Sequence, residues 1–85
     1  MNIYFSIDSQ VYSTAIQVQS MCNAITFWNR SDGTAYINGV PYLPGEKLEI
    51  SGNGGEIDTT IYKLSFDSAV TAPLVVVYRK TYIKK

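Results

Sequence analysis

Residues 35–45 read AYINGVPYLPG, and this stretch decides the fold. Asn38-Gly39 lies between short runs of strand-forming residues, which is the strongest local signal for a β-hairpin, because a type I′ turn needs positive φ at both central positions. A two-residue loop then pairs the residues on either side of it, and it places alternate residues of the two strands on one face. The predicted pairs are Ile37 with Val40, Tyr36 with Pro41, and Ala35 with Tyr42.

Pro41 carries no backbone N–H, so it leaves the hairpin intact but blocks a further strand on its other side. We therefore predict that 40–43 is an edge strand or the end of a strand. Pro44-Gly45 is typical of a second turn before a strand over 47–50.

Alternation of apolar and other residues predicts the remaining strands. The apolar residues Ile16 and Val18 have even numbers, whereas Ile25 and Phe27 have odd numbers. A continuous strand cannot change its buried face, so we expect a bulge or turn near 21–23. The alternating patterns predict strands at 3–7, 16–19, 25–28 and 61–66, with a turn at 8–10, a loop at 29–34 and a connection at 67–72.

The last predicted strand, 74–83, follows Pro73 and begins with a continuous apolar run, which indicates burial on both faces. About seven short strands without any helical period indicate an all-β protein. We predict a single-domain antiparallel β-sandwich over residues 1–85, immunoglobulin-like or jelly-roll-like, with a small β-barrel as the alternative.

Composition argues against several classes of function. The 85 residues have a formal net charge of zero, so neither nucleic acid nor an anionic membrane is expected as the main partner. The N-terminus lacks the basic region, long apolar stretch and cleavage site of a signal peptide, and we expect synthesis in a cytoplasm.

Catalytic signatures are also missing from the sequence. There is no histidine, and the single cysteine, Cys22, cannot form an internal disulfide. A buried, apolar thiol is the expected role of Cys22, with a reactive thiol as the alternative. The carboxylate pairs Glu46/Glu49 and Glu56/Asp58 lie in or beside turns, where a solvated role is expected. We predict that the chain is not an enzyme.

The segment 51–60 is rich in glycine and oxygen-bearing side chains. No basic residue accompanies the glycines, so their expected role is tight backbone turning rather than phosphate binding. Asp58 before Thr59-Thr60 predicts an Asx turn. The alternative is a calcium site formed by Asn53, Glu56 and Asp58, although the spacing is not that of an EF-hand. We expect no cofactor.

Two groups of residues are candidates for contact with a partner. Phe27 and Ile25 are two positions apart and are expected on the same, buried face. Trp28 then faces the other side, in a second core or an interface. Aromatic residues also suggest sugar binding, for which Trp28, Tyr36, Tyr42 and Tyr62 are candidates, but core or subunit contact is the preferred interpretation. Basic residues end the chain and provide either a solvated tail or a docking segment. The predicted contact residues are Trp28, Tyr36, Tyr42, Arg79, Lys80, Lys84 and Lys85.

Four short segments together resemble a known group of proteins. They are ITFWN (25–29), AYING (35–39), LPGE (43–46) and GNGGEIDTT (52–60). This pattern resembles small all-β structural modules in the virions of tailed bacteriophages, crAss-like phages included. In such proteins the module is an auxiliary (decoration) subunit or the part of a fibre that docks on the particle. The match covers the middle half of the chain, and the family implies no cofactor.

The resemblance implies a non-enzymatic virion structural protein that is made in the host cytoplasm. It would be a capsid auxiliary module that binds capsid or other virion proteins and stabilises the particle or supports an appendage. The expected partners are those proteins, with self-association into a homo-oligomer in addition. The alternative is a carbohydrate-binding β-sandwich module.

Overall fold

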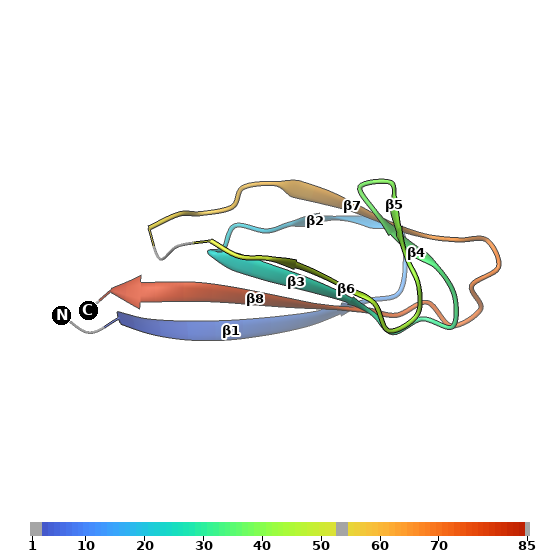
Figure 1. Ribbon diagram of the computed structural model, residues 1–85, viewed down its shortest axis with the longest axis horizontal. Coiled ribbons are helices and arrows are strands. Elements are labelled where there is room, and N and C mark those ends of the chain that lie inside the picture. The colour runs from blue at the N-terminus through green and yellow to red at the C-terminus, as the bar shows by residue number, and fades with distance from the viewer. Residues whose placement is uncertain (1–2, 53–54, 85) are drawn as a thin grey trace.

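The computed structural model describes residues 3–52 and 55–84, which form eight strands in two four-stranded antiparallel sheets (Figure 1). One sheet has the order β1-β8-β3-β6, and the other has the order β2-β7-β4-β5. The strands are β1 (Ile3–Tyr12), β2 (Ile16–Gln19), β3 (Ala24–Asn29), β4 (Ala35–Ile37), β5 (Val40–Tyr42), β6 (Lys47–Ile50), β7 (Ile61–Phe66) and β8 (Val75–Lys84).

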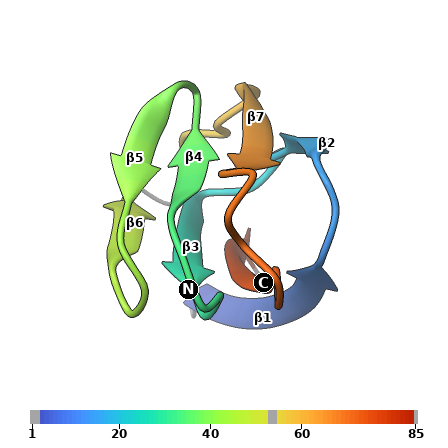
Figure 2. The ribbon, with the colours of Figure 1, turned by 90° about the vertical axis from the view of Figure 1, so that its right-hand side faces the viewer.

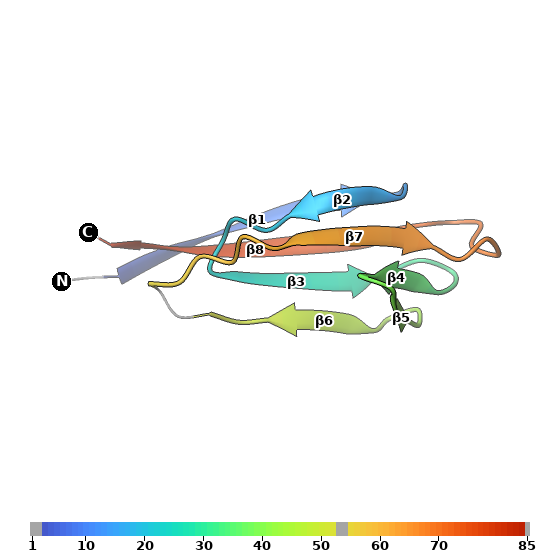
Figure 3. The same ribbon diagram turned by 90° about the horizontal axis from the view of Figure 1, so that it is seen from above.

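The two sheets lie face to face, as Figure 2 shows along the long axis of the molecule. Seen from above, β7 lies over β8, and β1 and β6 lie on opposite sides of their sheet (Figure 3). The molecule is elongated, with extents of 50 × 17 × 17 Å. The predicted β-sandwich is therefore confirmed, and the two sheets do not close into a barrel.

The central hairpin forms as predicted. Ile37 pairs with Val40, Tyr36 with Pro41, and Ala35 with Tyr42. Asn38 and Gly39 have φ values of 52° and 80°, the positive values that a type I′ turn requires. β5, which contains Pro41, is the edge of its sheet, so the prediction for this proline is also confirmed.

The apolar residues were predicted to change from even-numbered to odd-numbered positions near 21–23, and this is where the chain passes from one sheet to the other. β2 belongs to one sheet and β3 to the other, and Met21 between them has a φ of 44°. Val18 before the passage and Ile25 after it are both buried. The turn thus allows strands of opposite parity to contribute to one core.

Two sequence predictions about β1 and β8 are wrong. We expected a turn at 8–10, but β1 continues to Tyr12, because β8 offers an equally long partner and pairs Asp8 with Arg79 and Gln10 with Val77. We also expected the start of β8 to be buried on both faces. Val75 and Val77 are fully buried, but Tyr78 is exposed, because no described strand covers the outer face of this sheet.

The core fills the space between the sheets. Phe27 of β3 and Tyr62 of β7 pack against each other with their ring centroids 4.9 Å apart and their planes tilted by 57°, and both side chains are buried. The buried apolar residues are Val18, Cys22, Ile25, Phe27, Ala35, Ile37, Tyr62, Leu64, Val75 and Val77. The expectation that Cys22 is a buried thiol is confirmed.

Buried asparagines join the loops to the sheets. Asn29 donates from its Nδ2 to the carbonyl oxygens of Gly33 at 3.0 Å and Tyr42 at 2.8 Å, and its Oδ1 accepts from the Ser31 N–H. Asn23 Oδ1 accepts from the Tyr82 N–H at 2.7 Å. Among the described residues, every buried side-chain nitrogen and oxygen has a hydrogen-bond partner, as a stable core requires.

The core predicts a contrast between two positions of β7. Leu64 is 2% exposed and Ile61 is 52% exposed. Leu64→Ala should lower the free energy of unfolding by about 2–5 kcal/mol, because it removes buried apolar contacts and leaves a cavity. Ile61→Ala, the matched control, should lower it by less than about 1 kcal/mol. Urea unfolding measures both, and equal losses would contradict the packing described.

Candidate functional site

The outer face of the β1-β8-β3-β6 sheet is rich in aromatic and aliphatic side chains. Val75 and Val77 point into the core, so the even-numbered residues of β8 point outward. The strand register then places Phe5 opposite Tyr82 and Ile7 opposite Lys80. We call this surface the aromatic face, and its residues are Phe5, Ile7, Val11, Trp28, Val76, Tyr78, Lys80 and Tyr82.

Much of the aromatic face is open to solvent. Phe5 is 56% exposed, Ile7 61% and Val11 61%. These three residues lie on one face of β1, and Ser9, the residue of that face between Ile7 and Val11, is opposite Tyr78 of β8, so the three belong to one row rather than being isolated exposed side chains. Contiguous exposed apolar surface on a small protein marks a site of interaction.

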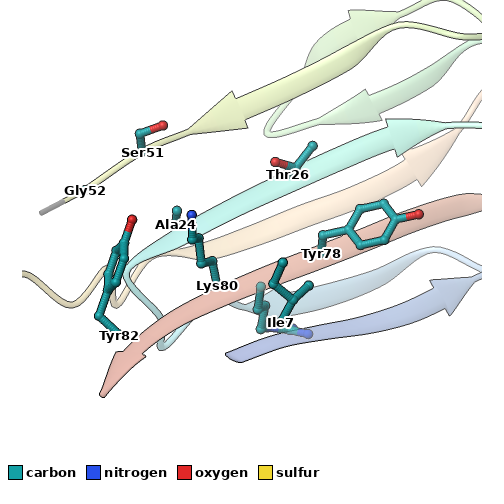
Figure 4. Close-up of a pocket in the computed structure, with 9 residues that line it drawn as sticks. Ile7, Ala24, Thr26, Ser51, Gly52, Tyr78, Lys80 and Tyr82 are labelled. Atoms are coloured by element: carbon teal, nitrogen blue, oxygen red, sulfur yellow. The ribbon is translucent and has the colours of Figure 1, made fainter. Parts of the chain in front are cut away.

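A shallow pocket of about 250 Å³ opens on this face (Figure 4). The side chains of Tyr78 and Tyr82 rise from β8 with Lys80 between them, and Ile7 lies beside them on β1. Thr26 of β3 and Ser51, just beyond β6, add hydroxyl groups. The pocket therefore offers rings, hydroxyl groups and one ammonium group, which together suit an apolar or acidic group of a partner.

Cations on this face stack on its rings. Lys80 Nζ lies 4.4 Å from the centroid of the Phe5 ring and 5.3 Å from that of Tyr82. Two cations lie over the Trp28 ring: Arg30 Cζ is 4.4 Å and Lys47 Nζ is 4.7 Å from its centroid. Such cation–π contacts hold the charged groups close to apolar surface and order the rings.

The predicted contact residues do not form one site. Trp28 and Lys80 lie on the aromatic face, whereas Tyr36 lies half-buried on the outer face of the other sheet. Tyr42 packs against the core. The side chain of Lys84 is outside the described part of the structure, as is the whole of Lys85.

Arg79 is held within the sandwich, on the inner side of β8. Its Nη1 donates to Gln10 Oε1 at 2.6 Å, and its Nη2 donates to the Gln19 carbonyl oxygen at 2.9 Å. Its Nε also lies 3.2 Å from the carbonyl oxygens of Gln19 and Ser20. Arg79 thus joins β8 and β1 of one sheet to the end of β2 in the other.

Sequence reasoning missed Phe5, Ile7, Tyr78 and Tyr82 as candidate contact residues. Their alternation was visible, but alternation normally marks a buried face. One signal was available in the sequence. The even-numbered residues of this strand, like the odd-numbered Val75 and Val77, include apolar ones, so the strand has two apolar faces. The core of a sandwich can cover only one of these faces.

The residues considered for sugar binding are also dispersed. Tyr62 is buried beneath the other sheet, and its hydroxyl donates to Asp58 Oδ2 at 2.7 Å. Tyr42 is turned toward the core, and Trp28 and Tyr36 lie on opposite faces of the sandwich. These four residues do not form a row of exposed rings.

Asp58 forms the predicted Asx turn, because its Oδ1 accepts from the Thr60 N–H at 2.9 Å. Its main chain also bridges to Cys22, and its carbonyl oxygen accepts from Ser20 Oγ at 2.6 Å. This corner therefore ties the connection between β2 and β3 to the start of β7. Asn53, part of the calcium alternative, lies outside the described residues, and the described residues contain no group of three or more acidic, cysteine or histidine side chains that could hold a metal ion.

Two opposing influences set the pKa of Asp58. Partial burial, the largest single one, raises it, but hydrogen bonds from Thr60, Tyr62 and Ser20 together outweigh burial and leave the pKa below its ordinary value. Burial and the hydrogen bond to Asp58 raise the pKa of Tyr62 to about 12. Burial also raises the pKa of the Cys22 thiol, so the thiol is the form present at neutral pH.

Comparison of the chain with protein-family models, with curated proteins and with solved structures gives no match in any of the three. A search of the described residues for a helix long and apolar enough to cross a membrane finds none.

The Asp58 corner predicts a pH-dependent stability. Because the pKa of Asp58 is lower in the folded state, its stabilising effect is fully present above the ordinary pKa of 3.8 and is lost as the pH falls through the folded value. Wild type should exceed Asp58→Asn by roughly 1 kcal/mol in free energy of unfolding at neutral pH, and this difference should shrink in acid. Urea unfolding across the pH range measures it.

The control for this prediction is Tyr62→Phe, which keeps the ring on Phe27 but removes the hydroxyl that donates to Asp58. Measured in the Tyr62→Phe background, the loss of stability on Asp58→Asn should be smaller than in wild type. A difference between wild type and Asp58→Asn that stays constant with pH would contradict the assigned role of the carboxylate.

Proposed function

We propose that this protein is a non-enzymatic structural protein of a virion, an auxiliary capsid module that binds capsid or other virion proteins through the aromatic face. The observation that carries the proposal is the row of exposed apolar residues Phe5, Ile7 and Val11 beside the pocket at Lys80. The virion as the place of action rests on the resemblance of the turn and strand segments to phage auxiliary modules.

The chemistry of the aromatic face suits adhesion. Burial of an exposed aliphatic or aromatic side chain contributes about 1.5–3 kcal/mol, so a few residues of the row supply substantial gross binding energy before the costs of association. Tyrosine, tryptophan and phenylalanine are enriched in the buried centres of interfaces. The stacked cations Arg30, Lys47 and Lys80 favour a partner surface that carries acidic groups.

The shape of the molecule agrees with this use. Two long strands paired along their whole length present the aromatic face, and Lys80 contacts two of its rings, so these side chains need little ordering on binding. Of the residues predicted from the sequence, Trp28 and Lys80 belong to this face, and Arg79 supports it from the inner side of the same strand.

A carbohydrate-binding module is the second candidate, and one observation favours it. Tyr78 and Tyr82 line a pocket together with the hydroxyl groups of Thr26 and Ser51, and rings beside hydroxyl groups are a common arrangement for sugars. The lining of this pocket therefore suits either function.

Particles purified from the source should contain the protein, and quantitative mass spectrometry should give its copy number per particle. Recombinant Tyr78→Asp should bind particles at least about tenfold more weakly than wild type, because a charged group replaces a ring at the pocket. Tyr36→Asp makes the same exchange on the opposite face and should bind as wild type does. The amount of protein that co-sediments with particles measures both.

Binding on a glycan array with no association with particles would overturn the virion assignment and support the carbohydrate alternative. Equal binding of particles by the Tyr78→Asp and Tyr36→Asp variants would show that the aromatic face is not the contact surface.

A further inference from the structure

The four edge strands of the sandwich differ in how they are protected against pairing with another chain. β5 has three residues and contains Pro41, and β2 has four residues. β6 has four residues, of which Lys47 and Glu49 are charged. Short length, proline and charge are the usual means by which proteins block the edges of sheets.

β1 lacks these protections. It has ten residues, no proline and a single charged residue, Asp8, and it pairs with β8 without a bulge along its whole length. β1 ends the order of its sheet, and the residues from Phe5 to Val11 are all exposed. A long, regular edge with apolar side chains is a template for strand addition.

We propose that β1 pairs antiparallel with β1 of a second copy of this chain, joining two four-stranded sheets into one continuous eight-stranded sheet. A second copy is the occupant that the sequence of β1 favours, because antiparallel self-pairing across a two-fold axis keeps outward residues beside outward residues. The exposed row of one copy then lies next to the row of the other.

The register of this pairing follows from length and charge. A two-fold axis perpendicular to the sheet places one residue of β1 opposite the same residue of the second copy. Centring on Ile7 or on Asp8 gives the longest overlap of two ten-residue strands. Centring on Asp8 would place two carboxylates directly opposite each other, which is destabilising. The pairing is therefore centred on Ile7, with Asp8 opposite Ser6 and Phe5 opposite Ser9.

This inference does not depend on what the aromatic face binds, since it concerns the edge of the sheet in the isolated protein. The dimer would carry two aromatic faces on the same side of one sheet. A failure to bind particles would leave the dimer unaffected, and a monomeric protein would leave the proposed function unaffected.

The test is a charge-pair exchange at the two-fold axis. Sedimentation velocity should show wild type as a dimer, whereas Ile7→Lys alone and Ile7→Glu alone should be monomers, because each places like charges opposite each other. An equimolar mixture of the two variants should restore the dimer, because Lys then faces Glu. Ile7 is 61% exposed, so both variants should fold, which circular dichroism checks.

Tyr78→Lys is the matched control, because it places the same charge on the same face but in β8, away from the edge. It should remain a dimer. A dimer that Tyr78→Lys dissociates would indicate stacking of two aromatic faces and would overturn the edge pairing. A monomeric wild type would overturn it too, and so would a mixture of Ile7→Lys and Ile7→Glu that stays monomeric.

Discussion

The structure depends on the contact between two sheets, at the centre of which the ring of Phe27 meets the ring of Tyr62. Successive side chains of a strand point to opposite faces of the sheet. The residues next to each one in this contact therefore point outward. In β7 the neighbours are Ile61, Lys63 and Ser65, of which two are polar. In β8 they include Val76, Tyr78 and Tyr82, which need a different explanation.

The apolar outer residues of β8 cannot be explained by the stability of the isolated sandwich. Polar residues at the same positions would preserve the inner face and expose less apolar surface to water. The Tyr82 ring instead receives the ammonium group of Lys80, and Trp28 receives cations at the other end of the face. A surface that is ordered and apolar at once is suited to contact with another macromolecule, and this is the physical basis of the proposed adhesive function.

The sequence predicted the features that local chemistry determines. Asn38-Gly39 set the hairpin and its register, and the parity change near Met21 marked the passage between sheets. The aromatic face was not predicted, because the continuous apolar run at the start of 74–83 indicates burial on both faces, whereas the outer face carries the exposed Tyr78. The inward position of Arg79 was missed as well, since its acceptors Gln10 and Gln19 lie about sixty residues or more away in the chain.

The two proposals meet in β1, because Ile7 belongs both to the aromatic face and to the unprotected edge. Pairing of two β1 strands would double the aromatic face on one rigid sheet without any new contact to a partner. Two linked sites bind a repeating surface more tightly than either site alone, since the second binding event is intramolecular. A capsid is such a surface, so self-pairing at the edge would strengthen the proposed attachment of so small a chain to it.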